Sequence, residues 1–182
     1  SIIHKTTRQI TEMSVGHIPE DRHRDGMVLE MTVAENIALQ TYYKEPNSKN
    51  GILNYNVINA KARELMEEFD VRGAGELIAG GDLSGGNQQK VIIGRWLLTQ
   101  PDILMLDEPT RGIDIGAKFE IYQLIQELAK KDKGIIMISS EMPELLGVTD
   151  RILVMSNGRV AGIVETAKTS QEEILQLAAK YL

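Results

Sequence analysis

The sequence predicts an α/β protein whose largely parallel sheet is flanked by helices. Beyond Pro101, short apolar runs typical of buried strands alternate with longer segments whose apolar residues recur at helical spacing. This alternation is typical of βαβ units, in which successive strands lie parallel and helices cover the sheet. Residues 32–99 instead read mostly as helices, so we expect an α-helical part beside the sheet.

The expected elements can be placed in chain order. A short strand over residues 15–18 leads into a polar loop over residues 19–26. Thr32 and Glu35 have the spacing of a capping box, which predicts a helix that runs to Leu39. Up to residue 98, the expected elements are a polar connection over residues 42–51, a helix over 56–69, a glycine-rich loop over 71–82 and a helix over 86–98. A strand over 103–106, a helix around 117–128 and a strand over 134–139 follow. The last expected elements are a short helix near 144, strands over 152–155 and 160–164, and a closing helix over 171–182.

Composition excludes several classes of function. The 182 residues suit one domain, with room for two subdomains. A net charge of -6 and a pI near 5.2 argue against a nucleic-acid binder, which usually carries a basic face. The absence of cysteine excludes disulfides and thiolate metal sites, and three histidines, all before Arg24, argue against zinc. No apolar run approaches the ~20 residues that a membrane-spanning helix needs.

The first motif with chemical meaning is Leu83-Ser84-Gly85-Gly86-Asn87-Gln88-Gln89-Lys90. It stands at the start of a predicted helix, where unpaired backbone N–H groups and the helix dipole favour an anion. The glycines let the backbone approach a ligand closely, and the Ser84 hydroxyl adds a donor. We therefore expect Ser84, Gly85, Gly86 and Asn87 to bind a terminal phosphate. The alternative is a simple serine N-cap after a flexible loop.

The second motif is the predicted strand 103–106, which ends in Asp107 and Glu108. Ligands of α/β sheets collect at the carboxyl ends of the strands, so both carboxylates are expected to face a site. Asp107 can hold Mg²⁺, and Glu108 can polarise or deprotonate the water that attacks a γ-phosphate. The alternative is an acidic strand end before a proline turn on an ordinary surface.

Together and at this spacing, the two segments resemble the signature motif and the Walker B strand of ATP-binding cassette (ABC) ATPases. Thr110-Arg111-Gly112-Ile113-Asp114 is similar to the D-loop, so Asp114 is implied to lie at a dimer interface near the opposite nucleotide. Asp114 also suits the N-cap of the next helix. No Gly-x-x-x-x-Gly-Lys-Ser/Thr sequence occurs, so the resemblance implies a partial P-loop NTPase fold with an α-helical subdomain but without the P-loop.

Two positions depart from the pattern of that family. Glu20 stands where the resemblance places the Q-loop glutamine, and Ser140 stands where it places the switch histidine. A carboxylate at Glu20 repels phosphate more than an amide does, although it can still bind a metal. Its alternative role is a solvated loop charge paired with Arg22 or Arg24. Both departures argue against hydrolysis that uses the Walker B strand of this chain.

Within the family, the chain resembles the second nucleotide-binding domain of bacterial sugar importer ATPases. From Leu83 onward it is similar to galactose/methyl-galactoside importer ATPases, whereas residues 16–22 and 40–46 are more similar to nucleoside importer ATPases. This split favours a fusion of two related proteins in the loop before Leu83, with a natural hybrid as the alternative. Because the chain starts at Ser1, we also expect a cytoplasmic fragment of a longer protein.

The resemblance implies ATP and Mg²⁺ as cofactors and an ATPase that energises import of a simple sugar such as galactose or methyl-galactoside. The alternatives are a nucleoside importer ATPase and a non-catalytic half that only completes a partner's ATP site. Implied partners are a paired cassette in the same polypeptide, membrane permease subunits and, indirectly, a periplasmic or lipoprotein substrate-binding protein. No nucleic acid is implied. The location is peripheral, on the cytoplasmic face of the bacterial inner or plasma membrane.

The family pattern also divides the chain into three parts. Residues 1–31 are expected to hold the end of the core sheet and the Q-loop-like segment, residues 32–99 the α-helical subdomain, and residues 100–182 the Walker B and D-loop core. Without a P-loop strand, we expect the strand 103–106 to lack a neighbour and to expose its edge. The chain alone is therefore expected to be inactive, and to be marginally stable or to self-associate.

Overall fold

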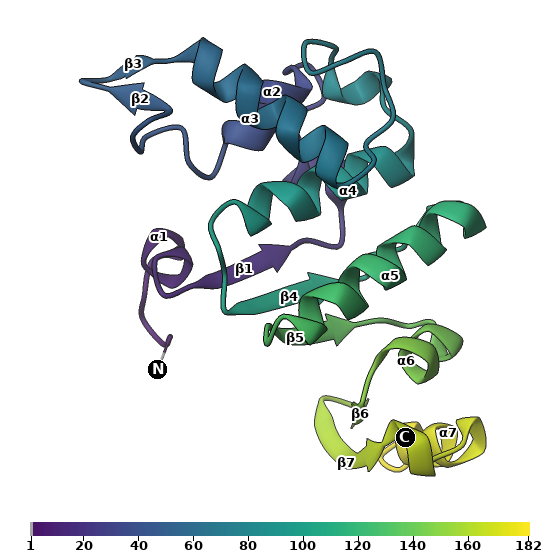
Figure 1. The fold of residues 1–182 in the computed structure, drawn as a ribbon. Helices are drawn as coiled ribbons and strands as arrows, with labels where there is room; N and C mark the ends of the chain where they lie inside the picture. Colours follow the sequence, from purple (N-terminus) through teal and green to yellow (C-terminus); the bar gives the residue numbers. More distant parts are fainter. Residues whose placement is uncertain (1) are drawn as a thin grey trace. The chain divides into compact units, whose positions relative to one another are not determined.

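The computed structural model describes residues 2–182, and the chain divides into two compact units (Figure 1). The first unit ends at Ile138, and the second consists of residues 139–182. Among the described residues, no helix is both long and apolar enough to cross a bilayer.

The first unit is built on a parallel sheet of three strands. They are β1 (Val15–Ile18), β4 (Ile103–Asp107) and β5 (Gly134–Ile138), and their order is β1-β4-β5. The expectation that the strand 103–106 lacks a neighbour is wrong, because β1 pairs with one side of β4 and β5 with the other. Among the described residues, β1 and β5 are the edge strands of this sheet, since each pairs with β4 alone.

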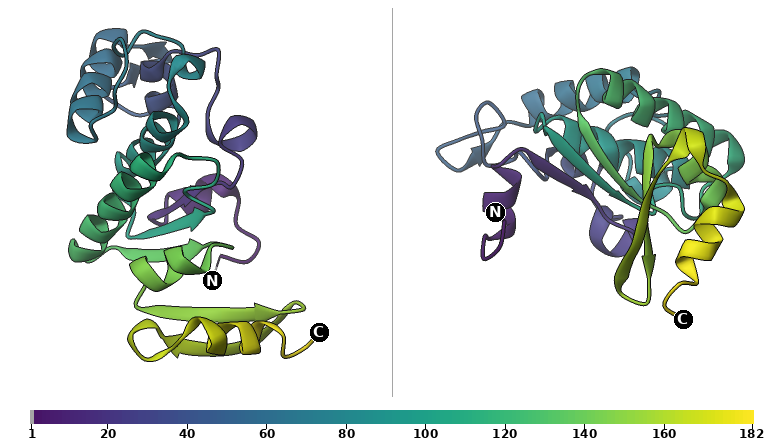
Figure 2. Two further views of the ribbon diagram at one scale, coloured as in Figure 1. Left: turned by 90° about the vertical axis from the view of Figure 1, so that its right-hand side faces the viewer. Right: turned by 90° about the horizontal axis from the view of Figure 1, so that it is seen from below.

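Helices cover one face of this sheet. α4 (Gly85–Leu97) contacts β1, and α5 (Ile115–Lys130) contacts β5, so both lie on the same side (Figure 2). The buried strand residues on this side include Ile18, Leu104 and Leu106. On the opposite side, Ile103, Ile136 and Ile138 remain 41%, 51% and 49% exposed. Parallel sheets are normally covered on both faces, so this face is unusual.

The helical part consists of α2 (Val33–Ala38) and α3 (Tyr55–Glu68), which pack on each other and on α4. The predicted capping box is confirmed: the Glu35 N–H donates to Thr32 Oγ1 at 3.1 Å, and the Thr32 N–H donates to Glu35 Oε2 at 2.8 Å. A Cβ atom at Gly94 would lie 2.8 Å from a Leu65 methyl group, so the glycine lets α3 approach α4 closely.

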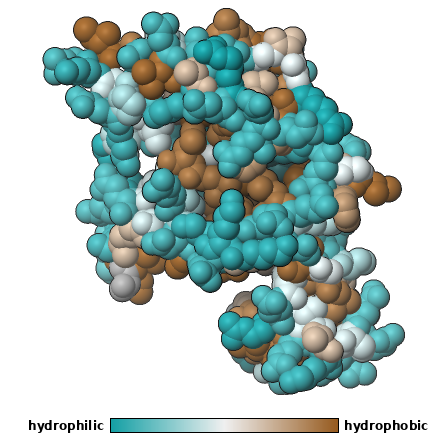
Figure 3. Space-filling view, in the orientation of Figure 1, coloured by the Kyte–Doolittle hydropathy of each residue, from teal (hydrophilic) through white to brown (hydrophobic). Residues whose placement is uncertain are grey.

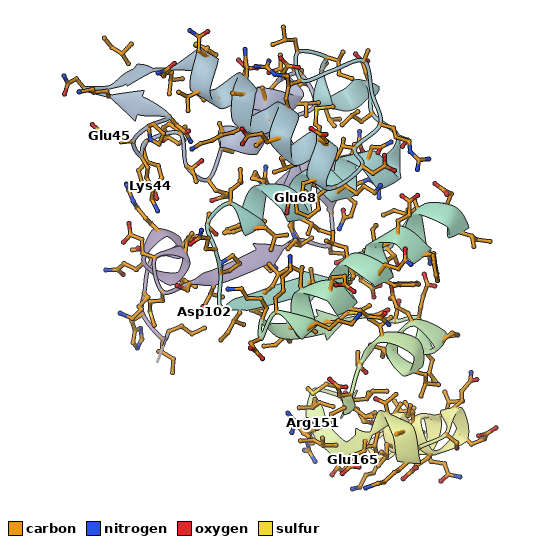
Figure 4. The ribbon with its side chains drawn as sticks, in the orientation of Figure 1. Lys44, Glu45, Glu68, Asp102, Arg151 and Glu165 are labelled. Carbon is orange, nitrogen blue, oxygen red and sulfur yellow. The ribbon has the colours of Figure 1, made fainter. Side chains whose placement is uncertain are left out.

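Several short elements were not expected from the sequence. They are α1 (Thr7–Thr11), the π-turn η1 (Arg22–Gly26), the hairpin strands β2 (Ser48–Lys49) and β3 (Ile52–Leu53), and the 3₁₀ turn η2 (Gly80–Asp82). Lys44 and Glu45 precede this hairpin (Figure 4). The hairpin turn is formed by Asn50 and Gly51, whose φ values of 53° and 79° are those of a two-residue hairpin turn. The Asn-Gly pair is a known sequence signal for such a turn.

The second unit is a small α/β cluster. It contains α6 (Met142–Val148), β6 (Arg151–Ser156), β7 (Arg159–Glu165), the 3₁₀ turn η3 (Thr166–Lys168) and α7 (Gln171–Ala178). β6 and β7 form an antiparallel hairpin, with Arg151 opposite Glu165 in register (Figure 4). The expected turn at Asn157 and Gly158 is confirmed by φ values of 45° and 75°. Ile152 and Val154 pack with Ile174 of α7 to form the core of this unit.

The surface of the first unit is not uniformly polar. Figure 3 shows hydrophobic residues, drawn in brown, in the middle of this unit and hydrophilic residues around them. The hydrophobic side chains with the largest exposure in this unit are Ile115, Ile52, Ile3, Leu77 and Phe119. Side chains of this kind need further packing only where they are contiguous.

Candidate functional site

The carboxyl ends of β1 and β4 open into a pocket of about 640 Å³. Its lining comes from the loop after β1 and the turn after β4: His17, Pro19, Glu20, Asp21, Arg22, His23, Arg24, Asp25, Asp107, Arg111 and Gly112. The lining contains both acidic and basic side chains. A somewhat larger hollow of about 760 Å³ beside the β2–β3 hairpin has Glu45 and Lys49 as its charged residues. Of the predicted site residues, Glu20 and Asp107 line the smaller pocket, and none lines the larger hollow.

Asp107 and Glu108 are held differently although they are adjacent. Asp107 is the last residue of β4, and its half-buried side chain lines the pocket. Glu108 is not among the lining residues. Its φ is 45°, and its N–H donates to the carbonyl of Ile138 at 2.9 Å. A glutamate in the left-handed region costs on the order of 1–3 kcal/mol, so the sharp turn after β4 is a strained feature.

Glu20 forms an ion pair with Arg111, which lies in the turn after β4. The alternative expected from the sequence, a pair with Arg22 or Arg24, is therefore not the arrangement found. Both side chains are at least half exposed, so the pair adds little to stability in water. It does neutralise the carboxylate of Glu20, whose place at a Q-loop position stays a prediction.

Arg22 connects the same two segments through the backbone. Its Nη1 donates to the carbonyl of Arg111 at 2.8 Å, and its Nη2 donates to that of Gly112 at 3.3 Å. The Asp21 carboxylate fixes the start of the η1 turn by accepting from the N–H groups of Arg24 and His23, both at 3.0 Å. These two hydrogen bonds, that of Arg24 first, hold the pKa of Asp21 below its ordinary value.

Ser84 occupies the N-cap position of α4, but its hydroxyl makes no capping hydrogen bond. Instead, the side-chain amide of Asn87 donates to Ser84 Oγ at 2.9 Å. The Asn87 carbonyl oxygen in turn accepts from the N–H of Arg72 at 2.9 Å. A simple serine cap is therefore not what the structure contains. The hydroxyl hydrogen of Ser84 is left to donate in another direction.

The absence of a side chain has a different structural reason at each of the two glycines of this motif. A Cβ atom at Gly86 would lie 2.5 Å from the Cβ of Ala117 on α5, so α4 and α5 can meet only without a side chain there. A Cβ atom at Gly85 would lie 3.0 Å from Nη2 of Arg22. The sequence attributed both glycines to close approach by a ligand. The structure gives Gly86 a packing reason instead, while Gly85 is partly exposed beside Arg22.

Asp114 and Ser140 lie in different units. Asp114 accepts from the N–H of Ala117 at 3.0 Å, which confirms the predicted N-cap of α5; its interface role stays a prediction. Ser140 belongs to the second unit, where the N–H of Glu141 donates to Ser139 Oγ at 3.0 Å and Ser139 hydrogen-bonds the buried Glu144. The role of Ser140 at a nucleotide likewise stays a prediction.

Sequence reasoning gave no site role to Arg22, or to Lys90 on α4. Lys90 is buried, and its Nζ lies 2.7 Å from a carboxylate oxygen of Glu120 on α5 and donates to the carbonyl of Asp70 at 2.9 Å. Lys90 therefore joins the motif helix to α5 and to the loop before it. A buried position for this lysine could be read from helical spacing, because Lys90 follows the buried Gly86 by one turn.

The residues of this chain can supply only part of a magnesium site, and other ligands must complete it. Among residues 2–182, no group of three or more His, Asp or Glu side chains can hold a metal ion. Protein-bound Mg²⁺ usually needs only one or two carboxylates, because phosphate oxygens and water supply the rest. Asp107 can provide one such ligand. The start of α4 can take a phosphate oxygen, with Ser84 as a donor.

A family model described as "ABC transporter" matches residues 2–111. The chain belongs to the ABC transporter family. This ABC chain is 56% identical over 173 residues to the nucleoside import ATP-binding protein NupA of Lactococcus lactis subsp. cremoris, covering 95% of the chain and 34% of NupA. It is 64% identical over 165 residues to the galactose/methyl galactoside import ATP-binding protein MglA of Pasteurella multocida, covering 91% of the chain and 32% of MglA.

The ABC chain thus spans about a third of the length of the curated relatives that it matches. Both matches cover more than nine-tenths of the chain, so each extends across the predicted junction before Leu83. The split between two kinds of importer ATPase is therefore not a clean division of the sequence. A fusion at that point stays a prediction.

Solved structures agree with the fold of this ABC chain. The ATP-binding cassette MJ0796, in a dimeric post-hydrolysis state bound to ADP and Pi, superposes with a TM-score of 0.71 at 22% identity, over 88% of this chain and 66% of that one. The cassette MJ1267 superposes with a TM-score of 0.73 at 25% identity, over 98% of this chain and 70% of that one. The predicted α/β fold of an ABC ATPase is confirmed.

Proposed function

We propose that this chain supplies one half of an ATP site in the ATPase of a simple-sugar importer. The observation that carries the proposal is the start of α4, where the Ser84 hydroxyl is not used as a helix cap and is held by Asn87. An exposed hydroxyl beside unpaired helix N–H groups favours a phosphate oxygen. Because the 182 residues contain no P-loop sequence, the phosphates would be held by the P-loop of a paired cassette.

Each predicted site residue then has a proposed role. Ser84 and Gly85 contact the terminal phosphate, Gly86 allows α4 to pack on α5, and Asn87 holds Ser84. Asp107 offers a ligand to Mg²⁺, and Glu108 acts on the attacking water if this half is catalytic. Glu20 and Ser140 occupy the Q-loop and switch positions, and Asp114 contacts the paired cassette near its nucleotide.

The proposed partners follow from the kind of relatives found. They are a paired cassette in the same polypeptide, permease subunits in the membrane and, through these, a substrate-binding protein. The chain would lie on the cytoplasmic face of the bacterial membrane. The 64% identity to MglA supports galactose or methyl-galactoside as cargo. The 56% identity to NupA over 95% of the chain supports a nucleoside as the second candidate.

Mg-ATP hydrolysis tests the proposal. We expect no turnover by the chain alone, and turnover when a cassette with an intact P-loop is added. The Ser84→Ala variant should lose this stimulation, since its backbone is intact but its phosphate donor is gone. Turnover by the unpartnered chain that exceeds that of its Glu108→Gln variant would contradict the proposal.

The same assay separates a catalytic half from a coupling half. If Glu108 acts on water in a site shared with the paired cassette, Glu108→Gln abolishes the stimulated turnover. If stimulation survives in Glu108→Gln but not in Ser84→Ala, the chain only completes the partner's site. Uptake of labelled galactose or of a labelled nucleoside by the complete transporter decides the cargo.

A further inference from the structure

Three segments of the first unit meet at the guanidinium group of Arg22. The segment that carries Arg22 is the loop after β1. The second is the turn after β4, whose carbonyls at Arg111 and Gly112 accept hydrogen bonds of 2.8 and 3.3 Å from Nη1 and Nη2. The third is the start of α4, where a side chain at Gly85 would come within 3.0 Å of Nη2.

The connection depends on the shape of the arginine side chain. A planar guanidinium can donate to two carbonyls at once, whereas a lysine ammonium is a single point donor. The Nε atom of Arg22 is buried and has no hydrogen-bond partner, so the group is partly removed from water. Gly112 has a φ of 66°, which turns the two accepting carbonyls toward the same guanidinium group and is easily adopted only by glycine.

A second link joins the same two segments. Glu20 pairs with the Arg111 side chain, while Arg22 donates to the Arg111 backbone. In one link the loop after β1 supplies the negative group, Glu20, and in the other it supplies the positive group, Arg22. The Asp21 carboxylate keeps the η1 turn in shape by accepting from two backbone N–H groups. As a result, the loop after β1 cannot shift far without moving the turn after β4.

We infer that Arg22 is a positioning residue that sets the D-loop-like turn and the start of α4 relative to the loop after β1. This inference rests on the proposed function, because it gives these segments a shared task at a nucleotide. Arg22 itself acts through the Arg111–Gly112 backbone and does not contact the nucleotide. Displacement of the loop after β1 is then transmitted to both other segments.

The test uses the complete protein that carries this chain, assembled with its permease. Arg22→Lys keeps the charge but cannot hold both carbonyls, and Arg22→Ala removes the group. We expect both to lower kcat for ATP hydrolysis at least ~10-fold, since small misplacements of reacting groups are costly. The KM for ATP should change by less than about 2-fold, because no binding contact is lost. The matched controls are Arg8→Lys and Arg8→Ala, whose exposed side chain lies on α1 and does not line the pocket.

Retention of kcat in Arg22→Lys would overturn the inference, because a charge alone would then suffice. A raised KM with unchanged kcat would also overturn it, since Arg22 would then be a direct ligand. Ser84→Ala is measured in parallel: if it leaves turnover unchanged, the proposed function fails whatever Arg22 does.

Amide hydrogen exchange tests Arg22 independently of turnover. In Arg22→Lys, the amides of residues 108–114 and 85–87 should exchange faster than in the wild type. The exchange rates of the α3 amides and the midpoint of thermal unfolding should stay unchanged. Equal exchange in the wild type and Arg22→Lys contradicts the positioning role. Faster exchange throughout the first unit would also contradict it, since Arg22 would then be a general stabilising residue.

Discussion

The side-chain amide of Asn87 donates a hydrogen bond of 2.9 Å to the hydroxyl oxygen of Ser84. The orientation of that amide is set from its other side, because its oxygen accepts from the Arg72 N–H. A hydroxyl that accepts from an amide must point its own hydrogen elsewhere. Asn87 thus orients the Ser84 hydroxyl so that its hydrogen points away from the amide.

This relationship predicts that Asn87 acts through Ser84. Asn87→Ala should lower the stimulated ATP turnover, because the hydroxyl loses its orientation. In a Ser84→Ala background, the same change should have almost no further effect. A double-mutant cycle of turnover rates measures this coupling. Independent, multiplicative losses would show that Asn87 has a role of its own.

Gly86→Ala is expected to destabilise the first unit by about 1–3 kcal/mol, because the added methyl group overpacks the contact with Ala117. Chemical denaturation followed by the fluorescence of Trp96, the single tryptophan, measures the change. Gly147→Ala on α6 is the control, since a Cβ atom there meets nothing within 4 Å. Equal stability of Gly86→Ala and the wild type would mean that α4 and α5 can separate freely.

Lys90→Met should cost about 1–3 kcal/mol, because it removes the buried ammonium group that contacts the carbonyl of Asp70 and the Glu120 carboxylate. Lys130→Met is the matched control: its side chain is 69% exposed against 7% for Lys90, and it pairs with Glu127 on the surface. The free energy of unfolding should not change measurably in this control. Similar losses in the free energy of unfolding in both variants would show that the burial of Lys90 does not contribute to stability.

Acid should weaken the η1 turn. The N–H groups of Arg24 and His23 hold the pKa of Asp21 below its ordinary value of 3.8. Its contribution to stability is therefore fully present above 3.8 and is lost as the pH falls from there through the lower pKa of the folded state. Asp21→Asn should flatten this part of a plot of Tm against pH. Parallel curves for variant and wild type would refute the assignment.

Self-association of the chain is expected to occur through the open edge and face of β5. Ile136→Lys places a charge on this strand and should shift sedimentation toward the monomer. Ile52→Lys is the control, because Ile52 is 74% exposed but lies in the β2–β3 hairpin. If both variants associate as the wild type does, the contact lies elsewhere.

Local rules predicted much of the fold correctly. The capping box at Thr32 and Glu35, the cap at Asp114 and the turn at Asn157-Gly158 each depend on residues a few positions apart. The strands around residues 103–106 and 134–138 were recognisable because each is a continuous apolar run. Elements as short as α1 and η1 carry too few residues for a periodic pattern.

Contacts between distant segments could not be predicted in the same way. Glu20 was expected to pair with a neighbour in its own loop, but its partner Arg111 is 91 positions away. Only the parallel pairing of β1 with β4 brings those loops together. Similarly, the neighbour expected to be missing beside β4 is supplied by β1, because a preceding strand can fill that side of a parallel sheet. The functional division into residues 1–31, 32–99 and 100–182 stays a prediction.

The far end of α4 also contacts the loop after β1. The Arg95 guanidinium donates to the carbonyl of Gly26 at 2.5 Å, and a Cβ atom at Gly26 would lie 2.9 Å from the tip of Ile92. The loop after β1 therefore packs against the last turns of α4, the helix that begins directly after Ser84. A displacement of that loop would tilt a helix about 20 Å long, and the end next to Ser84 would move with it.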